Sequence, residues 1–331
     1  MWGCSHIRQK PKIACNIRKC IARRDALHKG TIVIIDQRAL DLVFKGFKTV
    51  YTDAYLKAEV HWDKVAMKVT SGGSDETYGW LGLFPNMRQW VGSRVVRSLA
   101  VHSFTIENLD FESTVSVPRN AIMDDKLGVF KPTFAELGHI TRQHPEELIF
   151  DLLANGFDTQ CYDGQNFFDT DHPVGDTTEQ TTTVSNMVAG SGPAWFLLDT
   201  SREVRPIVWQ ERKPYEFVTK TNADDDNVFF NKEFLYGIDA RVNAGFGLWQ
   251  LAYGSKAALT KGAYAAARAA MMNYKSAEGR ILGVKSTVMV VPPELEDAAL
   301  HILNADLNEA GGSNPWSGTA QLIVSPYLSA A

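Results

Sequence analysis

The residues best suited to chemistry lie in one short stretch of the chain, which contains Cys161, Asp163, Asp169, Asp171 and His172. Carboxylates clustered beside an imidazole can bind a divalent metal ion or carry out acid–base catalysis. Asp, Gly and Asn are also residues that form turns by hydrogen bonding to their own backbone. The stretch lacks the closing Glu of a calcium-binding EF-hand loop. We therefore interpret it as a structural loop, and we keep a metal-dependent hydrolase built on Asp163–His172 as the alternative.

Other candidate sites also have a simpler structural interpretation. Cys161 and His172 could pair as nucleophile and base, but no third member is recognisable, and a small buried cysteine is the better interpretation. The acidic run 224–226 could hold calcium, although a solvated turn explains it as well. Motifs for phosphate, dinucleotide, serine-hydrolase and zinc-protease sites are missing from the sequence. We expect no catalytic residue, no cofactor and no bound metal.

The charge of the chain is divided unevenly along its length. Residues 1–30 hold eight Lys or Arg and one acid, which gives this segment a charge of +7. Because the whole chain has a net charge of −4, residues 31–331 carry −11. An acidic body disfavours nonspecific nucleic-acid binding over most of its surface. Three of the four cysteines, Cys4, Cys15 and Cys20, lie in the basic leader, where their spacing matches no standard zinc pattern. One cysteine in the body fits a reducing compartment.

The leader 1–30 has no sustained apolar period and carries blocks of like charge, which predicts disorder. It also has no apolar core of a secretory signal, and no apolar run in the chain reaches the length of a membrane span. The composition, with 45% hydrophobic and 22% charged residues, is ordinary for a globular protein. These features predict a soluble protein with no membrane partner.

Apolar spacing predicts the main elements of the body. Residues 40, 43, 44, 47 and 51 repeat at intervals of three and four, which predicts an amphipathic helix over 40–56. A helical stretch is predicted from Pro132 to Gly156, with a break or bend near Pro145 because proline lacks the amide hydrogen. Thr260 is expected to cap an Ala-rich helix over 261–277 that Gly279 closes. A last helix is predicted within 292–303. Strands are expected at 195–199, 205–210, 214–220, 228–249, 286–291 and 319–328.

Residues 93–122 are rich in Val, Ile, Phe and Thr, with a turn signal at 108–110, and they predict a long hairpin that projects from the body. Such a ribbon exposes more apolar surface than it can bury alone. Aromatic side chains around it are either core or interface anchors. The candidates for assembly contacts are Trp80, Phe84, Trp90, Arg94, Phe104, Phe111 and Glu112.

Three segments carry a resemblance to a known family. They are TYGWLGLFPNMRQWVGSRV (77–95), MDDKLGVFKPTFAELGHITRQHPEELIFDLLANGF (123–157) and CYDGQNFFDTDHPVG (161–175). Together they resemble the major head subunits of phage Mu and Mu-like prophages, and the similarity runs from about Ile32 to the C-terminus. Family members begin near Ile32 or Val33, so the leader is either a native extension or the product of an upstream start codon.

The resemblance implies an α+β architecture, the Hong Kong 97-type capsid fold. In that fold we expect an N-terminal arm, an extended hairpin called the E-loop, a peripheral domain with a long spine helix, and an axial domain. The expected ranges are 31–78 for the arm, 79–126 for the E-loop region, 127–258 for mainly the peripheral domain, and 259–331 for mainly the axial domain and a C-terminal strand.

The resemblance also implies a function: a major capsid protein, not an enzyme, which self-assembles into the icosahedral head. Its implied partners are other copies of itself in hexamers and pentamers, scaffold and portal proteins, and packaged double-stranded DNA without sequence specificity. The implied location is the virion capsid, assembled in the cytoplasm of the bacterial host. Closed rings of identical subunits and contacts between rings would build the shell.

Overall fold

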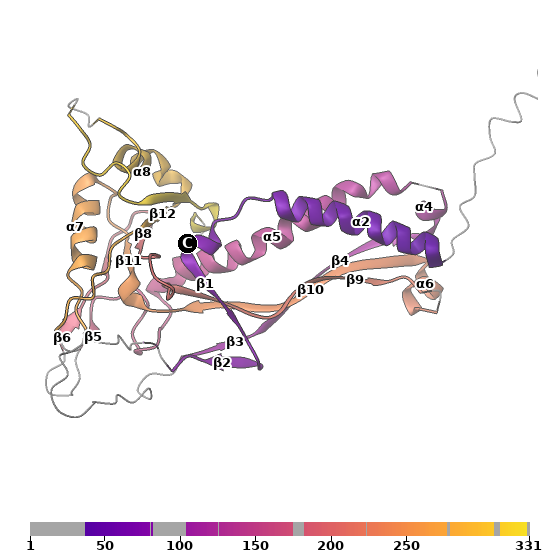
Figure 1. The fold of residues 1–331 in the computed structure, drawn as a ribbon, viewed down its shortest axis with the longest axis horizontal. Coiled ribbons are helices and arrows are strands. Elements are labelled where there is room, and N and C mark those ends of the chain that lie inside the picture. Colours follow the sequence, from indigo (N-terminus) through magenta and orange to yellow (C-terminus); the bar gives the residue numbers. More distant parts are fainter. Residues whose placement is uncertain are drawn as a thin grey trace, which may run out of the picture.

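The computed structural model describes residues 37–79, 81, 104–124, 126–174, 182–222, 224–276, 279–307 and 312–329. The molecule has a globular end and a long limb (Figure 1). The leader 1–30 lies outside the described residues, so its predicted disorder stays a prediction. None of the helices in the described ranges is long and apolar enough to span a membrane.

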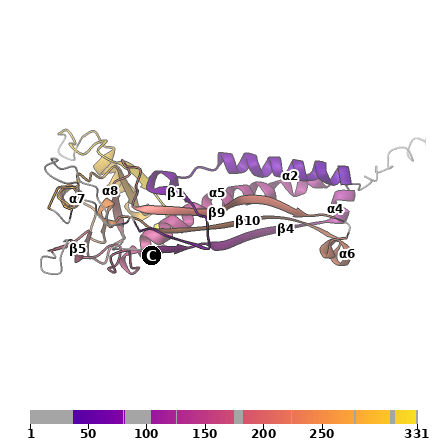
Figure 2. The ribbon, with the colours of Figure 1, turned by 60° about the horizontal axis from the view of Figure 1, so that its bottom comes forward.

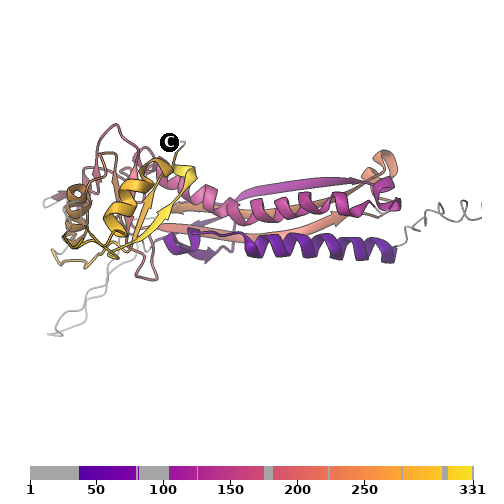
Figure 3. The same ribbon diagram turned by 90° about the horizontal axis from the view of Figure 1, so that it is seen from above.

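The limb is a twisted four-stranded sheet covered on one face by two long helices, which lie side by side when seen from above (Figures 2 and 3). The strands, in sheet order, are β1 (Ala66–Thr70), β9 (Ile207–Lys220), β10 (Glu233–Phe246) and β4 (Leu109–Pro118). The helices are α2 (Gln37–Lys57) and α5 (Lys131–Ala154). Alternate residues of β10 face the helices, and their apolar side chains stack there with rings from α2 and α5. The aromatic centre of this core contains Phe47, Phe134, Phe217 and Tyr236.

The helix predicted over 40–56 is confirmed as α2, with Leu40, Phe47 and Tyr51 buried. The helix predicted from Pro132 is confirmed as α5. Of the break or bend predicted near Pro145, the break is wrong, because the helix is continuous through Pro145. Proline removes the hydrogen bond to the carbonyl of Thr141, and its ring crowds that carbonyl. Buried side chains on both sides of Pro145 hold the helix against the two cores of the molecule, and this packing outweighs the cost of the proline.

The predicted hairpin over 93–122 is wrong for its second half. β4 pairs antiparallel with β10 from Glu233↔Pro118 to Val242↔Leu109, so it is an integral strand of the limb. The short β3 (Thr105–Glu107) pairs with β2 (Asp75–Thr77) and not with β4. Asn108 does not form a hairpin turn, since its buried side chain donates to Ser71 and Gly73. A β-rich segment pairs wherever an unpaired strand edge of matching length exists, and β10 offers that edge. Residues 93–103 lie outside the described residues.

Strand β9 joins the two strands expected at 205–210 and 214–220 into one. The register with β10 shifts between Lys213 and Glu216, so Pro214, which cannot donate to the ladder, lies at a bulge. The strand expected from 228 begins later, at Glu233, because residues Asp226–Asn231 form the short helix α6 at the end of the limb.

The globular end is built on a five-stranded sheet. Its order is β13 (Gln321–Val324), β12 (Val288–Val291), β8 (Trp195–Leu198), β11 (Ala252–Ser255) and β7 (Met187–Val188). Every residue of β8, β11 and β12 is buried, which explains their continuous apolar sequences. The helices at this end are α7 (Lys261–Met272) and α8 (Glu296–Leu303). Thr260 caps α7 as predicted by accepting the N–H of Ala263, although the helix ends seven residues before Gly279.

The remaining elements are short. They are α3 (Trp62–Val65), α4 (Arg119–Met123), β5 (His172–Val174), β6 (Thr182–Val184) and the 3-10 turns η2 (Leu127–Val129), η3 (Asn155–Phe157), η4 (Trp249–Leu251), η5 (Pro293–Leu295) and η6 (Pro326–Leu328). The chain crosses between limb and globular end several times. Residues between α5 and β9, and those after β10, therefore share the globular end, so the two expected domains interleave along the sequence.

Candidate functional site

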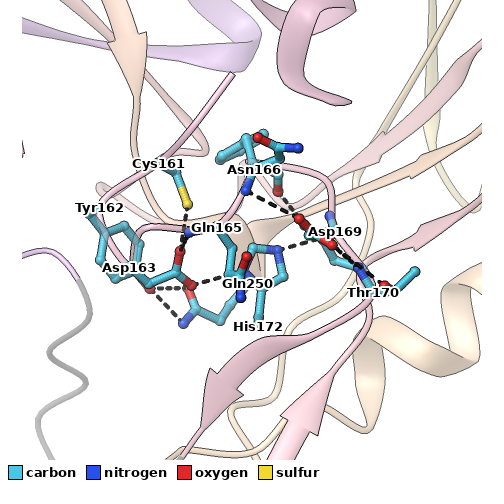
Figure 4. Close-up of polar contacts among 11 residues, drawn as sticks. Cys161, Tyr162, Asp163, Gln165, Asn166, Asp169, Thr170, His172 and Gln250 are labelled. Atoms are coloured by element: carbon cyan, nitrogen blue, oxygen red, sulfur yellow. Dashed lines mark hydrogen bonds and ion pairs between the residues drawn. The ribbon is translucent and has the colours of Figure 1, made fainter. Parts of the chain in front are cut away.

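The structure brings together three of the five residues singled out for chemistry. Cys161 and Asp163, from the loop that leads from η3 to β5, meet His172 at the start of β5, while Asp169 lies in a neighbouring turn (Figure 4). His172 is fully buried and Cys161 is 5% exposed. The cluster lies inside the globular end, where it fixes the start of the β5–β6 hairpin.

Asp163 is the centre of the cluster. One carboxylate oxygen, Oδ1, accepts the thiol of Cys161 at 3.1 Å and the backbone N–H of Gln165 at 3.1 Å. The other, Oδ2, lies 2.8 Å from Nδ1 of His172. The carboxylate therefore joins both ends of the loop, and each of its oxygens already has a partner.

The far side of the His172 ring meets an acceptor whose orientation is fixed. Nε2 lies 3.2 Å from Oδ1 of Asn186. That amide cannot be reversed without loss, because its Nδ2 donates to the carbonyl of Phe167 and its Oδ1 accepts the N–H of Asp169. Both ring nitrogens of His172 are therefore hydrogen bonded, Nδ1 to Asp163 and Nε2 to Asn186. Trp249 stacks on the imidazole with ring centroids 4.0 Å apart and planes 11° apart.

The environment makes the cysteine a poor nucleophile. Burial raises the pKa of the Cys161 thiol, and the adjacent Asp163 carboxylate raises it further. Burial also pushes the pKa of Asp163 upward, but the hydrogen bonds from His172 and Cys161 outweigh this, and the pKa of the carboxyl lies below its ordinary value. A neutral thiol beside an ionised carboxylate lacks the thiolate that covalent catalysis needs.

The same contacts argue against a metal centre. Ligand atoms of Cys161, Asp163 and His172 lie within 4.8 Å of one another, which is close enough for a divalent ion. However, each of these atoms already takes part in a hydrogen bond within the cluster, and an ion would have to replace those bonds. The geometry fits a buried polar clamp that holds a loop, as the turn interpretation of this stretch predicts.

Asp169 and Asp171 have turn roles. Oxygens of Asp169 accept the N–H groups of Thr170 at 2.6 Å and Asn166 at 3.3 Å. The exposed Asp171 shares a hydrogen bond with Asp169, which raises the pKa of Asp171. In the acidic run, Asp225 accepts the N–H of Asn222 at 2.9 Å, so this run also forms a turn.

Only part of the predicted assembly set can be placed. Trp80, Phe84, Trp90 and Arg94 lie outside the described residues. Phe104 and Phe111 are half-buried and pack against the main core of their own chain, which is the larger apolar core that includes the five-stranded sheet. The ring centroids of Phe111 and His144 also lie 4.4 Å apart. Both are therefore mainly core side chains. Glu112 is exposed on β4 and accepts the hydroxyl of Thr114.

Sequence reasoning missed the partners that complete the clamp. Asn186, which directly precedes β7, and Trp249, which begins η4, lie 14 and 77 positions beyond His172, and no local pattern connects them to it. The neighbouring pair Tyr162 and Gln250 is buried in the same way, with the phenol oxygen 3.0 Å from Oε1 (Figure 4). The sequence indicates these contacts only in a general way, because a polar residue among apolar neighbours needs a hydrogen-bond partner when it is buried.

An elongated limb of sheet and spine helix, joined to a globular end, defines the Hong Kong 97-type class of viral capsid proteins. Residues 40–328 match the model of the Mu-like prophage major head subunit gpT family, and the chain belongs to that family. It is a major capsid protein, which is a structural and not an enzymatic class.

Individual relatives agree with this assignment. The chain is 39% identical over 305 residues to the major capsid protein of Escherichia phage Mu, covering 89% of this chain and 100% of the phage protein. It is 38% identical over 297 residues to the Mu-like prophage FluMu major head subunit of Haemophilus influenzae, covering 86% and 96%. It superposes on a subunit of the procapsid of bacteriophage JBD30 with a TM-score of 0.80 and 40% identity, covering 88% and 100%. The family predicted from the sequence is confirmed.

Proposed function

We propose that copies of this chain assemble in the cytoplasm of a bacterial host into a closed head that encloses double-stranded DNA, together with scaffold and portal proteins. The observation that carries the proposal is the similarity to the JBD30 procapsid subunit, which extends over the full length of that subunit at 40% identity. An elongated shape with two distinct ends also suits a subunit that must contact several neighbours at once.

Within this function we assign proposed roles to the parts of the chain. The limb formed by α5, β4, β9 and β10 corresponds to the peripheral domain, with α5 as its spine helix. The five-stranded sheet with α7 and α8 corresponds to the axial domain. The helix α2, within the range expected for an N-terminal arm, packs along α5. Since β4 is part of the limb sheet, residues 109–118 are removed from the range 79–126 that we propose for the E-loop region.

The residues Trp80, Phe84, Trp90 and Arg94 keep their proposed role as contacts with a neighbouring copy. Tryptophan and arginine are enriched among the side chains that dominate interface energies. Glu112 can add a rim contact because it is exposed. Phe104 and Phe111 are the weakest candidates, because much of their surface already packs on their own chain. The basic leader, if it is present in the mature subunit, carries the charge to meet DNA or an acidic scaffold inside the shell.

The direct test is to express the full chain and separate the lysate by sedimentation. Shell formation predicts large particles or rings that electron cryomicroscopy can resolve. The alternative, a metal-dependent hydrolase at Asp163–His172, predicts a small species whose activity is lost with a chelator. Only small species under all conditions, with a chelator-sensitive hydrolytic activity, would contradict the proposal.

A further inference from the structure

One half-buried histidine lies near the middle of the long helix α5, on the side that faces the limb sheet. His144 directly precedes Pro145. Its Nδ1 lies 2.6 Å from the hydroxyl oxygen of Tyr215 on β9. Its ring meets that of Phe111 on β4 edge to face, with centroids 4.4 Å apart. The imidazole therefore connects the helix to two strands of the sheet at once.

The imidazole lines a groove of about 270 Å³ between α5 and the edge strand β4. The walls of this groove are mainly apolar side chains, namely Phe111, Leu137, Ile140 and Ile238. A charged group placed among apolar side chains loses hydration, and this loss disfavours its charged form. The hydrogen bond to Tyr215 does not reverse this preference, because either of its two atoms can be the donor.

The charged groups around the ring offer little to offset a positive charge on it. Glu112 of β4 lines the same groove, but it is exposed and accepts the hydroxyl of Thr114 at 2.7 Å. Glu147, on α5 itself, is also exposed, and solvent screens the attraction of both carboxylates. Burial raises the pKa of Tyr215, so its phenol stays neutral. The titratable groups around that phenol are Tyr51, Tyr55 and Glu211.

The packed structure therefore favours the neutral imidazole. Burial lowers the pKa of His144, and the carboxylate of Glu147 offsets this only in part. A histidine whose pKa is depressed in the folded state contributes stability that is present above its ordinary pKa of about 6.5 and is lost as the pH falls through the lower folded value. Mild acid should thus weaken the contact that this ring makes.

The contact lies where α5 has the least bonding of its own. Pro145 removes one hydrogen bond of the helix and crowds the turn before it. On one side of this point Leu137 enters the limb core, and on the other side Ile149 enters the main core. The sheet contact made by His144 therefore supports the helix between the two cores that it joins.

From these observations we propose that His144 is a proton-sensitive joint, and that uptake of a proton by its imidazole releases the middle of α5 from β4 and β9. The neutral ring holds the helix through Tyr215 and Phe111, whereas the imidazolium is better solvated outside the groove. The joint is a property of the single subunit, so it does not depend on shell assembly and can be tested in unassembled subunits.

The test measures amide hydrogen exchange of α5 by mass spectrometry at about pH 7.5 and about pH 5.5, with each rate divided by the intrinsic rate at that pH. We expect opening of the helix around His144 to become about three- to tenfold more frequent at the lower pH. Tenfold is the upper limit, because one unit below its ordinary pKa of about 6.5 a released imidazole is protonated by about that factor.

Three variants assign the effect to one side chain. His144→Gln keeps a group that can hydrogen bond to Tyr215 but cannot titrate, and its opening should change by less than about twofold. His139→Gln, at an exposed histidine of the same helix, is the matched control and should respond like wild type. Glu146 is the other buried titratable group beside Pro145, and it accepts the N–H of His61 at 2.9 Å.

Burial raises the pKa of Glu146 above its ordinary value of 4.5. A raised carboxyl pKa means that protonation favours the packed state, so acid acts on Glu146 in the opposite direction to its action on His144. Glu146→Gln should therefore show a pH response at least as large as that of wild type. A response that persists in His144→Gln, or that disappears in Glu146→Gln or His139→Gln, would overturn the inference.

A direct titration keeps the proposal testable if His144→Gln does not fold. Nuclear magnetic resonance of the wild-type chain with carbon-13-labelled histidines follows each imidazole as the pH changes, and contact with the protons of Phe111 identifies His144. We expect this ring to titrate below about pH 6.5, the ordinary value for histidine, together with loss of its contact to Phe111. A titration at or above that value, or a contact that survives protonation, would contradict the proposed release.

Discussion

Replacement of Asp163 tests whether the buried cluster is a hydrogen-bonded clamp. In Asp163→Ala the acceptor disappears, and three donors lose their partner: the thiol of Cys161, the N–H of Gln165 and Nδ1 of His172. An unsatisfied buried donor costs about 1–3 kcal/mol, and the thiol counts for less because it is a weak donor. We therefore expect Asp163→Ala to lower the free energy of unfolding by about 3–5 kcal/mol, which is the sum of these losses.

Asp163→Asn is the matched control because it preserves the shape and most of the bonds. The amide oxygen can accept from Gln165 and Cys161, as Oδ1 does now. The amide NH₂ then faces Nδ1 of His172, which can accept if the ring is neutral and keeps its proton on Nε2 for Asn186. Every buried group keeps a partner in this arrangement, so the expected loss is under about 2 kcal/mol.

The assay is urea unfolding of unassembled subunits, followed by far-ultraviolet circular dichroism and by tryptophan fluorescence, because Trp249 stacks on His172. Midpoints and slopes together give the free energies. A loss under about 1 kcal/mol in Asp163→Ala would refute the clamp, since at least two strong donors would then be unsatisfied without cost. Equal losses in both variants would show that the negative charge matters and not the number of bonds.

Four further outcomes are expected. Because the pKa of Asp163 is lower in the folded state, its stabilising contribution is present above about pH 4 and is lost as the pH falls through the folded pKa, so acid titration of unfolding should bring wild type and Asp163→Asn closer together. In Gly138→Ala a Cβ would overlap the carbonyl oxygen of Tyr51 and lie 3.1 Å from the amide nitrogen of Tyr55, which should cost about 1–3 kcal/mol by urea unfolding as α2 and α5 are pushed apart. Thr260→Ala removes the cap of α7 and should cost about 1 kcal/mol, while Thr260→Ser should restore it. Deletion of 1–30 should leave the fold and the urea midpoint unchanged, and an intact mass from particles that begins near residue 32 or 33 would show that the leader is absent from the mature subunit.

The pairing of β4 with β10 decides what a deletion in this region does. If 93–122 formed a projecting hairpin, deletion of residues 100–114 would leave a folded subunit unable to form shells. That deletion removes β3 and the first six of the ten residues of β4, with the pairing of Leu109–Thr114 to β10, and we expect it to unfold the limb. A deletion confined to 82–103 tests the proposed E-loop without this loss. Circular dichroism of the two deletions separates the cases, because only the first should lose its native spectrum.

The sequence was informative where structure depends on neighbours along the chain. Spacings of three and four residues are enough to place α2, because an amphipathic helix buries one face whatever it packs against. Thr260 could be identified as a cap because its acceptor reaches an N–H only three residues ahead. Long-range pairing left no such signal. The ten residues of β4 show β character, but nothing local states that their partner is β10, more than a hundred positions later.

Pro145 shows the opposite error, in which a local rule was applied too strongly. The rule holds that proline removes one bond and its ring crowds the preceding turn. It says nothing of the packing on either side, where Phe134 and Leu137 enter the limb core and Ile149, Phe150 and Leu153 enter the main core. One helix thus spans both cores of the molecule, and a break in it would separate them. Tertiary contacts at both ends keep α5 continuous where its own sequence favoured an interruption.

The positions of polar and apolar groups explain why chemistry-like residues in this chain do not form a reactive site. A catalytic group must reach a substrate, yet His172 is fully buried, and its two ring nitrogens are hydrogen bonded to Asp163 and Asn186. The most exposed aromatic rings of the described residues, Phe229 and Phe230, lie instead on α6 at the far end of the limb. Buried polar bonds give a single loop geometry, and exposed apolar surface gives a contact whose strength multiplies when many identical copies meet. A subunit that repeats its contacts around a closed shell needs both properties, and the fold supplies them at opposite ends of the molecule.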